Sequence, residues 1–550
     1  MNASGAVRRL SVTIEQEKQF ERLSPFELKD KLIQLAKDSS RKSARTMLNA
    51  GRGNPNWIAT TPRSAFFALG DFALEESKSV WDRPDLGGMP RKEDIGKRFD
   101  TYAAAHRGNT GVDFLKRALT YATTQLNVDP EAFLYELVDG VIGDQYPSPD
   151  RMLFYAERVV HEYLVQEMSG GRRPAGKYDL FAVEGGTAAM CYIFDSLMAN
   201  GLVRRGDKIA LATPTFTPYL EIPKLDRFSF EVVEIKASEV TDDSGRHNWQ
   251  YPDSEIEKLS DPEIKVVFFV NPSNPPSTAI RQETMDRLSA VVHSKRQDLM
   301  IVTDDVYGTF VPGFRSLMVE LPQNTIGVYS FSKYLGCTGW RLGVVAIHED
   351  NIFDRKLAQL SPEELARLNE RYGTLTLRPE KLKFIDRMVA DSRSVALNHT
   401  AGLSTPQQVQ MTLFSLFALM DESGAYKKLS QQIVRTRMQA LCKGMGVDLP
   451  NDPLRADYYT TLDLMVWARR TRSPEFVRFL EDHYHPFDVL FALAERYSTV
   501  LLNGSGFEGP EWSVRVSLAN LPDEAYTEIG SQLSAVLHGA FEAWQAQEKK

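Results

Sequence analysis

The sequence predicts an α/β protein with a mainly parallel, seven-stranded-type sheet beside a smaller α+β domain. Between residues 150 and 348, short apolar runs alternate with amphipathic helical segments, as in chains that build parallel sheets. Most of these runs end in glycine, proline or polar residues. A second pair of strand-like segments, YYTTLDLMVW and VRVSLANL, lies near the C-terminus and precedes a long helical pattern. These observations predict two packed units of unequal size.

The first 145 residues are predicted to be largely helical. The segment SPFELKDKLIQLAKDS has a Ser-Pro helix start, and an irregular stretch, LNAGRGNPNWIATTPR, follows it. We assign residues 1–65 to an N-terminal arm that forms part of the small domain. Residues 66–145, with segments such as GVDFLKRALTYATTQL, form a helical extension.

The remaining chain is predicted to contain the large domain and most of the small one. Residues 146–398 form the large domain, because the strand-like runs DLFAVEGG, DKIALATP, IKVVFFVNP, LMIVTDDVYG, TIGVYSFSK and RLGVVAIH fall there. Within it, residues 349–397 are charged and helical and are predicted to be an insertion. Residues 399–550 supply a connecting helix, LSTPQQVQMTLFSLFALM, and the C-terminal part of the small domain.

Bulk composition excludes several functional classes. The chain of 550 residues has a formal net charge of −8 and a pI of about 5.8, which gives a nucleic-acid partner no electrostatic support. Three widely spaced cysteines argue against a disulfide framework and a structural zinc site, and we expect no metal. An apolar stretch typical of a signal peptide or a membrane span is not found, so we expect the cytoplasm and no membrane partner.

A lysine follows one of the buried-type strands in the segment GVYSFSKYLGCTGWRLG. Burying an ammonium group costs free energy unless the group is paired or neutralised. We therefore expect Lys333 to have a chemical role. The segment resembles the cofactor-binding segment of fold-type I enzymes that use pyridoxal 5′-phosphate (PLP), specifically the aspartate aminotransferase family. The resemblance implies that Lys333 is the catalytic lysine that holds PLP covalently. It also implies that Ser330 and Arg341 hold the phosphate.

Two further segments resemble parts of the same family that hold the PLP ring. In IVTDDVYGTF, Asp304 would pair with the ring nitrogen and Tyr307 would bond the phenolic oxygen. In VVFFVNPSNPPS, Asn274 would donate to that same oxygen. This second segment departs from the family pattern at Pro276 and Ser277, where the family has Thr and Gly, which puts the turn geometry in doubt.

Two strand-to-helix junctions complete the cofactor site that the resemblance implies. In FAVEGGTAAM, Gly185, Gly186 and Thr187 stand where a strand enters a helix, and the exposed N–H groups there form an anion site. In LATPTFTPYL, Phe216 takes the place that the family gives to an aromatic residue over the cofactor ring.

The family resemblance also implies substrate contacts and a partner subunit. Arg515, in WSVRVSLANL, matches the arginine that binds the substrate α-carboxylate. Tyr146, in GDQYPSP, matches the tyrosine that reaches the phosphate of a neighbouring subunit, so a homodimer with shared active sites is expected.

The additional regions resemble the bacterial L-aspartate 4-decarboxylases. This resemblance covers essentially the whole chain and rests on the N-terminal helical block, the LNAGRGNPNWIATTPR stretch and the insertion. It implies conversion of L-aspartate to L-alanine and CO₂, a side activity of aspartate aminotransfer in which pyruvate returns the cofactor to its starting form, and possible assembly into a dodecamer. Arg52, and less strongly Lys29, are our candidates for binding the side-chain carboxylate.

Three alternatives stay open from the sequence. One is a plain aminotransferase for aspartate or a related amino acid, whose insertions only build an oligomer. Another is a cyclopropane-forming synthase of the same fold, which the length and the N-terminal region fit less well. The last is a non-catalytic regulator, for which the N-terminus offers neither an obvious recognition helix nor the charge balance of a DNA-binding module.

Overall fold

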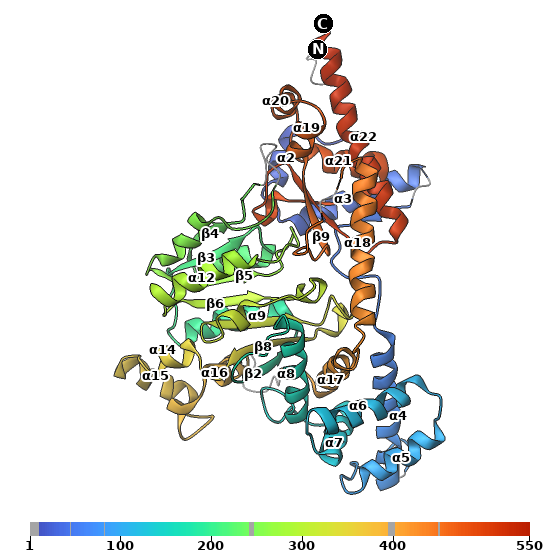
Figure 1. The fold of residues 1–550 in the computed structure, drawn as a ribbon, viewed down its shortest axis with the longest axis vertical. Helices are drawn as coiled ribbons and strands as arrows, with labels where there is room; N and C mark the ends of the chain where they lie inside the picture. The colour runs from blue at the N-terminus through green and yellow to red at the C-terminus, as the bar shows by residue number, and fades with distance from the viewer. Residues whose placement is uncertain are drawn as a thin grey trace.

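The chain folds into an elongated molecule with the sheet in its middle. A computed structural model describes residues 10–43, 46–81, 83–240, 247–393, 402–448 and 451–549. Figure 1 shows the C-terminal domain at one end of the long axis and a block of helices at the other. The boundary predicted at residue 398 lies outside the described residues. The other predicted domain boundaries stay predictions.

In the described part of the chain, seven strands form the central sheet in the order β2-β8-β7-β6-β5-β3-β4. Only β8 runs against its neighbours, so the predicted mainly parallel sheet is confirmed. Runs such as IKVVFFV are apolar on both faces because both faces are covered by helices. The strands are β2 (Tyr178–Val183), β3 (Lys208–Thr213), β4 (Glu231–Lys236), β5 (Ile264–Val270), β6 (Met300–Asp304), β7 (Thr325–Ser330) and β8 (Gly343–His348).

Alternate side chains of one strand pack against helices on opposite faces of the sheet. Leu180 and Ala182 join the apolar cluster of α8 (Phe154–Met168) and α17 (Thr405–Leu419), whereas Phe181 and Val183 join that of α9 (Gly186–Ala199). Helix α12 (Gln282–Ser294) covers the β5 and β6 end. Short helical turns connect the strands: α10 (Thr217–Glu221), η1 (Ile222–Lys224), α11 (Asp253–Glu257), η2 (Lys258–Ser260), η3 (Gly308–Phe310), α13 (Leu317–Glu320) and η4 (Thr338–Trp340).

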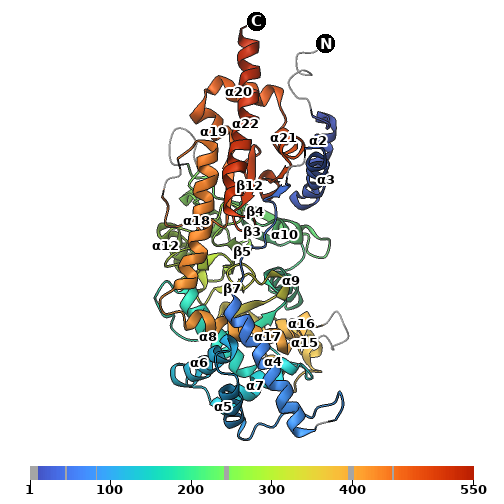
Figure 2. The same cartoon turned by 90° about the vertical axis from the view of Figure 1, so that its right-hand side faces the viewer.

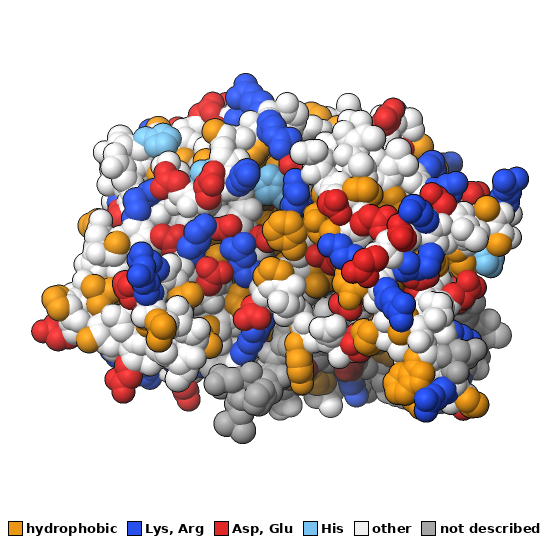
Figure 3. Space-filling model, turned by 90° about the horizontal axis from the view of Figure 1, so that it is seen from below, with side chains coloured by type: hydrophobic (Ala, Val, Ile, Leu, Met, Phe, Trp, Pro, Cys, Tyr) orange, Lys and Arg blue, Asp and Glu red, His pale blue; other side chains and the backbone are white. Residues whose placement is uncertain are grey.

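A block of four described helices extends the molecule beyond α17. It consists of α4 (Thr60–Val80), α5 (Ile95–Ala105), α6 (Thr110–Gln125) and α7 (Pro130–Ile142), and its apolar core is continuous with that of the sheet. Asn109 caps α6 by accepting from Gly111 N and Val112 N, and Asp129 caps α7 in the same way. Figure 3, a view onto this end, shows acidic and basic side chains interspersed with apolar ones. No helix in the described ranges has the length and apolar character that crossing a bilayer requires.

The N-terminal segment packs into the C-terminal domain, as Figure 2 shows for α2 (Ile14–Phe20) and α3 (Pro25–Ser43). Strand β1 (Leu48–Asn49) pairs in parallel with β10 (Thr499–Val500). The domain also contains α18 (Ala425–Met445), β9 (Tyr459–Asp463), α19 (Leu464–Thr471), α20 (Pro474–His483), α21 (Asp488–Tyr497), β11 (Leu502–Asn503), η7 (Ser505–Phe507), β12 (Ser513–Ser517) and α22 (Asp523–Glu548).

Two local features of this domain follow from single residues. The segment YYTTLDLMVW, predicted as one strand, changes to helix after Asp463, because the Asp463 carboxylate accepts from Met465 N and Val466 N and starts α19. Helices α18 and α22 pack closely where Gly444 and Gly530 meet. A Cβ atom at either glycine would collide with the backbone of the opposite helix.

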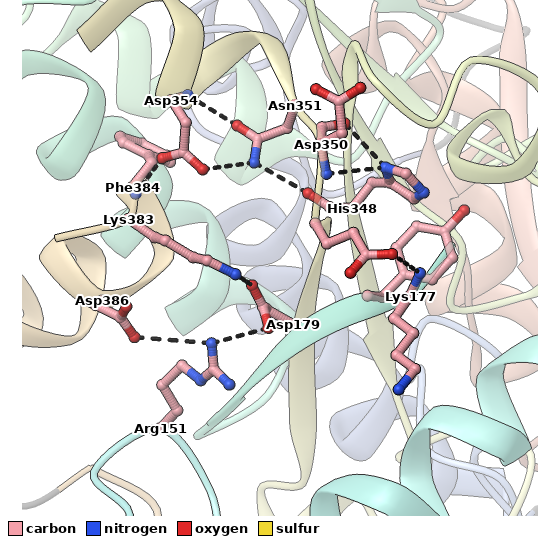
Figure 4. Close-up of polar contacts among 12 residues, drawn as sticks. Arg151, Lys177, Asp179, His348, Asp350, Asn351, Asp354, Lys383, Phe384 and Asp386 are labelled. Atoms are coloured by element: carbon pink, nitrogen blue, oxygen red, sulfur yellow. Dashed lines mark hydrogen bonds and ion pairs between the residues drawn. The ribbon is translucent and has the colours of Figure 1, made fainter. Parts of the chain in front are cut away.

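The segment predicted as an insertion forms helices at the β2 edge of the sheet. These are α14 (Ile352–Leu357), α15 (Pro362–Tyr372), η5 (Pro379–Lys381) and α16 (Phe384–Ser392). Figure 4 shows how charged side chains fasten it: Lys383 lies 2.6 Å from Asp179 on β2, and Arg151 bridges Asp179 at 3.2 Å and Asp386 at 3.7 Å.

A buried carboxylate ties the insertion to α9. Asp391 accepts from Ser196 Oγ at 2.7 Å, from the Tyr372 hydroxyl at 2.9 Å and from Arg371 Nη2 at 2.8 Å. Asn200 Nδ2 donates to it at 3.2 Å. Removal of this carboxylate would leave several buried donors without an acceptor.

We therefore expect Asp391→Ala to destabilise the contact between α9 and α15–α16 by about 3 kcal/mol. Hydrogen exchange of amides in these helices, measured by mass spectrometry, would show faster exchange there and unchanged exchange in α4–α7. The matched control is Asp350→Ala, which removes an exposed partner of Arg355 and should cost less than about 1 kcal/mol. Equal rates of amide exchange in α9 and α15–α16 of the two variants would contradict the prediction.

Candidate active site

A cavity of about 320 Å³ opens at the carboxyl ends of β5, β6 and β7, between the sheet and the C-terminal domain. This is the edge at which parallel sheets bind ligands. Its walls come from the N-terminal segment, the sheet and strands β9 and β12. The lining residues are Phe26, Gly53, Asn54, Gly186, Thr187, Phe216, Tyr219, Val270, Asn274, Asp304, Val306, Tyr307, Ser330, Ser332, Lys333, Thr338, Arg341, Tyr459 and Arg515. Most of the residues predicted from the sequence are among them.

Lys333 reaches the cavity from the loop after β7. It is half-buried, and its Nζ donates to the Gly53 carbonyl at 3.1 Å. In the described part of the chain, no carboxylate lies within ion-pair distance of this amine. A single carbonyl therefore holds the amine, which leaves it available for covalent chemistry with a carbonyl compound.

Asp304 is the last residue of β6 and is buried. Burial raises the pKa of its carboxyl group, and hydrogen bonds from the Tyr219 hydroxyl and from Val306 N, together with the Lys333 charge, act in the opposite direction. A buried carboxylate that faces a cavity is stabilised by a cation or by a protonated ring nitrogen. Asp304 could therefore hold the pyridinium nitrogen of PLP.

Asn274 and Tyr307 point their polar groups at each other. Asn274 Nδ2 donates to the Tyr307 hydroxyl at 3.5 Å, which is a long contact. The Asn274 carbonyl oxygen is buried and has no hydrogen-bond partner among the described residues. Burial, and the neighbouring Tyr459, raise the pKa of Tyr307 well above its ordinary value. Neutral donors of this kind could bond an oxygen atom of a bound cofactor.

The start of α9 and Arg341 form a cradle that suits a phosphate group. Gly185 has φ = +92°, and a side chain there would collide with the Arg341 guanidinium. Arg341 donates to the Thr338 carbonyl at 2.9 Å and the Glu184 carbonyl at 3.1 Å. Among the described residues no carboxylate neutralises it. Gly186, Thr187 and Ser330 line the same part of the cavity.

Arg515, on β12, is a fully buried cation. Its Nη2 donates to the Gly51 carbonyl at 3.0 Å, and its buried Nε has no partner in the part of the chain that the structure describes. The rings of Tyr459 and Phe507 lie 4.4 Å and 4.8 Å from the guanidinium carbon. Burial lowers the pKa of Arg515. Within the described ranges no carboxylate lies at ion-pair distance, so this group is suited to bind an anion that enters the cavity.

Four candidates from the sequence are not among the residues that line the cavity. Gly185 is one of them, although it lies against the Arg341 guanidinium. The other three are Arg52, Lys29 and Tyr146. The Arg52 side chain is exposed, although the flanking carbonyls of Gly51 and Gly53 contact Arg515 and Lys333. The Lys29 ammonium lies 5.6 Å from the centre of the Phe26 ring, which does line the cavity. Tyr146 is 76% exposed. Their proposed roles stay predictions.

Sequence reasoning missed several lining residues. Tyr219 stands three positions after Phe216, in the helical turn that opens with it, so helical spacing could have indicated it. Phe26, Asn54 and Tyr459 come from segments that reach the cavity only through the packing of the small domain. Tyr458 and Tyr459, at the entry to β9, gave a signal, because adjacent residues of an extended segment face opposite sides.

The chain is similar to known proteins in sequence and in fold. The family described as aminotransferase class I and II matches residues 179–533. A bifunctional aspartate aminotransferase and L-aspartate beta-decarboxylase from Pseudomonas sp. is 50% identical over 526 residues, which cover 95% of this chain and 97% of that protein. An aspartate aminotransferase from Thermus thermophilus, solved with maleate, has a TM-score of 0.54 at 17% identity, over 94% of this chain and 96% of that one. A Pyrococcus structure titled protein-A1 has a TM-score of 0.56 at 17% identity, over 94% of this chain and 98% of that one.

A second carboxyl group, that of Asp305, lies next to Asp304 in the chain. Asp305 is buried, and its Oδ1 accepts from Thr303 Oγ1 at 2.7 Å while Oδ2 accepts from Ser316. Burial raises the pKa of Asp305 to about 7, the two hydroxyl groups oppose that change, and Asp304 adds to it. The folded protein therefore keeps this proton at a pH where the unfolded chain has lost it.

This proton makes stability depend on pH in a defined direction. Between about pH 4 and pH 7 unfolding releases the Asp305 proton, so rising pH favours the unfolded chain. We expect Asp305→Asn to lack this dependence. The stability of the variant relative to the natural protein should then grow by about 3 kcal/mol over that range and stay level above it. Denaturant unfolding of both proteins from pH 4 to pH 8 measures the difference, and a constant difference would refute the assignment.

Proposed function

Because this chain belongs to the aminotransferase class I and II family, we propose that it is a PLP-dependent enzyme that converts L-aspartate to L-alanine and CO₂ and also transfers the amino group of aspartate. The observation that carries the proposal is the 50% identity to the bifunctional Pseudomonas enzyme over 95% of the chain. That similarity extends beyond the family match, across the helical block α4–α7.

The cavity supports a specific placement of the cofactor. When bound, PLP draws bonding electrons from an attached amino acid, which eases the loss of a proton or of CO₂. Asp304 would hold the ring nitrogen, Tyr307 and Asn274 the phenolic oxygen, and Phe216 would cover the ring. Lys333 would carry the covalent attachment.

The phosphate would lie at the start of α9. There Gly185, Gly186 and Thr187 offer N–H groups and a hydroxyl, and Ser330 and Arg341 complete the set. The Arg341 guanidinium supplies a fixed positive charge and a planar fork of donors. This charge has no carboxylate partner in the described structure, which supports its use for an anion.

Arg515 would bind the substrate α-carboxylate through two parallel hydrogen bonds. Its carbonyl contact to Gly51 and the rings around it hold the guanidinium in one orientation before the substrate enters. The Lys333 amine, when it is not attached to the cofactor, would remove the proton from the substrate α-carbon and return it. Binding of the substrate carboxylate and transfer of the proton are thus assigned to different side chains, Arg515 and Lys333.

The side-chain carboxylate makes a different demand, because it must be recognised and must then leave as neutral CO₂. A tight bidentate contact would stabilise the substrate more than the transition state. Arg52 and Lys29 are proposed for a looser contact, since both belong to the N-terminal segment that borders the cavity. We also propose a homodimer in which Tyr146 of each chain reaches the other's phosphate site, possible assembly of such dimers into a dodecamer, and a cytoplasmic location.

A plain aspartate aminotransferase is the alternative, because the family match over residues 179–533 fits it equally well. Incubation of the PLP-loaded protein with L-aspartate separates the two. We expect one alanine and one CO₂ for each aspartate consumed, with a small amount of oxaloacetate. Aminotransfer converts the aldehyde group of the cofactor to an amine. Added pyruvate should restore the aldehyde and so sustain the reaction. Stoichiometric oxaloacetate without CO₂ would exclude the decarboxylase.

The attachment of the cofactor can be tested without substrate. Lys333→Ala should lose the visible absorbance band of covalently bound PLP and all activity toward aspartate, because no other lysine lines the cavity in the described part of the chain. Lys265→Ala, at the opposite end of β5, is the control and should keep both. A band that persists in Lys333→Ala would mean that another lysine forms the attachment.

A further inference from the structure

Tyr459 is a buried tyrosine that the proposed reaction has not yet used. It is the first residue of β9, is 3% exposed, and lines the cavity. The Arg515 guanidinium lies over the Tyr459 ring, with the guanidinium carbon 4.4 Å from the ring centre. The contact with Arg515 holds the ring in place at the cavity lining.

The Tyr459 hydroxyl and the Lys333 amine converge on the same backbone position. A Cβ atom built on Gly53 would lie 2.6 Å from Tyr459 Oη and 3.3 Å from Lys333 Nζ. Only a glycine leaves this space open. Two groups that can carry protons therefore face one small region, between the N-terminal segment and the loop after β7.

The acidity of Tyr459 differs from that of the tyrosines around it. Burial would raise the pKa of Tyr459, but the positive charges of Lys333 and Arg515 and a hydrogen bond with Tyr307 outweigh burial, and the pKa is lowered. The pKa values of Tyr307 and of Tyr458 are both raised well above the ordinary value. Tyr459 is thus the tyrosine of this group best able to give up a proton.

The proposed reaction needs one more proton donor than has been assigned. Loss of CO₂ leaves an electron pair where the carboxylate stood, and a proton must take its place. Lys333 serves the α-carbon, and Asp304 and Tyr307 are assigned to the cofactor. The Tyr219 hydroxyl already donates a hydrogen bond to Asp304. Arginine does not release its proton at neutral pH, so Tyr459 is the remaining ionisable side chain of the cavity lining.

We propose that Tyr459 is a further catalytic residue, whose hydroxyl delivers the proton to the substrate β-carbon after CO₂ has left. This inference rests on the proposed decarboxylase function. The bond between the β-carbon and the carboxylate carbon breaks, its electron pair stays on the substrate side, and that pair forms the new C–H bond with the Tyr459 proton. The phenolate then takes a proton from water, so each turnover consumes one proton and oxidises nothing.

The test separates the two products of a single turnover. In Tyr459→Phe, which keeps the ring against Arg515, CO₂ should be released from L-aspartate at close to the natural rate. Alanine formation should fall about 100-fold. The aminotransfer half-reaction, followed by oxaloacetate, should be preserved. A parallel fall in CO₂ and alanine would show that the hydroxyl only positions substrate, and unchanged alanine formation would show that another group delivers the proton; either result overturns the proposal.

A matched control is available in the adjacent residue. The Tyr458 hydroxyl donates to the Gly53 carbonyl at 2.9 Å, but Tyr458 does not line the cavity. Tyr458→Phe should change CO₂ and alanine formation by the same factor. The rate of alanine formation by the natural enzyme should also fall at high pH as Tyr459 ionises. The groups that face Tyr459 and influence this ionisation are Lys333, Arg515, Tyr307 and Tyr458. In Tyr459→Phe the rate should not fall in this way at high pH.

Failure of the decarboxylase function would be recognised separately. If the natural enzyme releases no CO₂ from aspartate, the proposed function fails before any variant is compared. If it releases both products and Tyr459→Phe forms alanine normally, only the role of Tyr459 fails.

Discussion

The buried Arg515 guanidinium is the constraint on which the site depends. A cation without a carboxylate partner costs several kcal/mol to bury, and here one carbonyl and a set of aromatic rings offset part of that cost. The rings of Phe26, Tyr459 and Phe507 come from three distant parts of the chain. Folding of the small domain therefore creates a place where an anion is strongly favoured. The same packing closes one wall of the cavity.

Arg341 repeats this arrangement on the other side of the cavity. Both guanidinium groups donate to carbonyl groups, and neither has a carboxylate at ion-pair distance among the described residues. Between them lie Lys333 and the buried Asp304. A compound with two anionic ends and an aldehyde or amine between them would satisfy these groups together, which is the physical basis for PLP carrying an amino acid.

The parts of the site that the sequence predicted are those coded within short segments. Ser330 ends β7, and Lys333 and Arg341 follow it within eleven residues. Asp304 ends β6 and Asn274 follows the neighbouring strand β5, so strand order alone brings these residues to one edge. Tyr459 and Phe26 could not be found in this way, because they reach the cavity only after the N-terminal segment has packed on β9 and β12. The strand predicted over YYTTLDLMVW was too long for a local reason: the Asp463 side chain starts a helix there.

The pairing of β1 with β10 has a consequence for the order in which the molecule folds. Leu48 pairs with Thr499, so roughly 450 residues separate the two partners. At typical rates of synthesis the earlier partner waits on the order of half a minute for the later one. During that interval the apolar face of α3, including Leu28 and Leu32, has no C-terminal domain to cover it. The N-terminal arm of a growing chain is thus open to wrong contacts until the C-terminal segment has been made, and the part of the cavity wall that Phe26 and Gly53 supply cannot form before then.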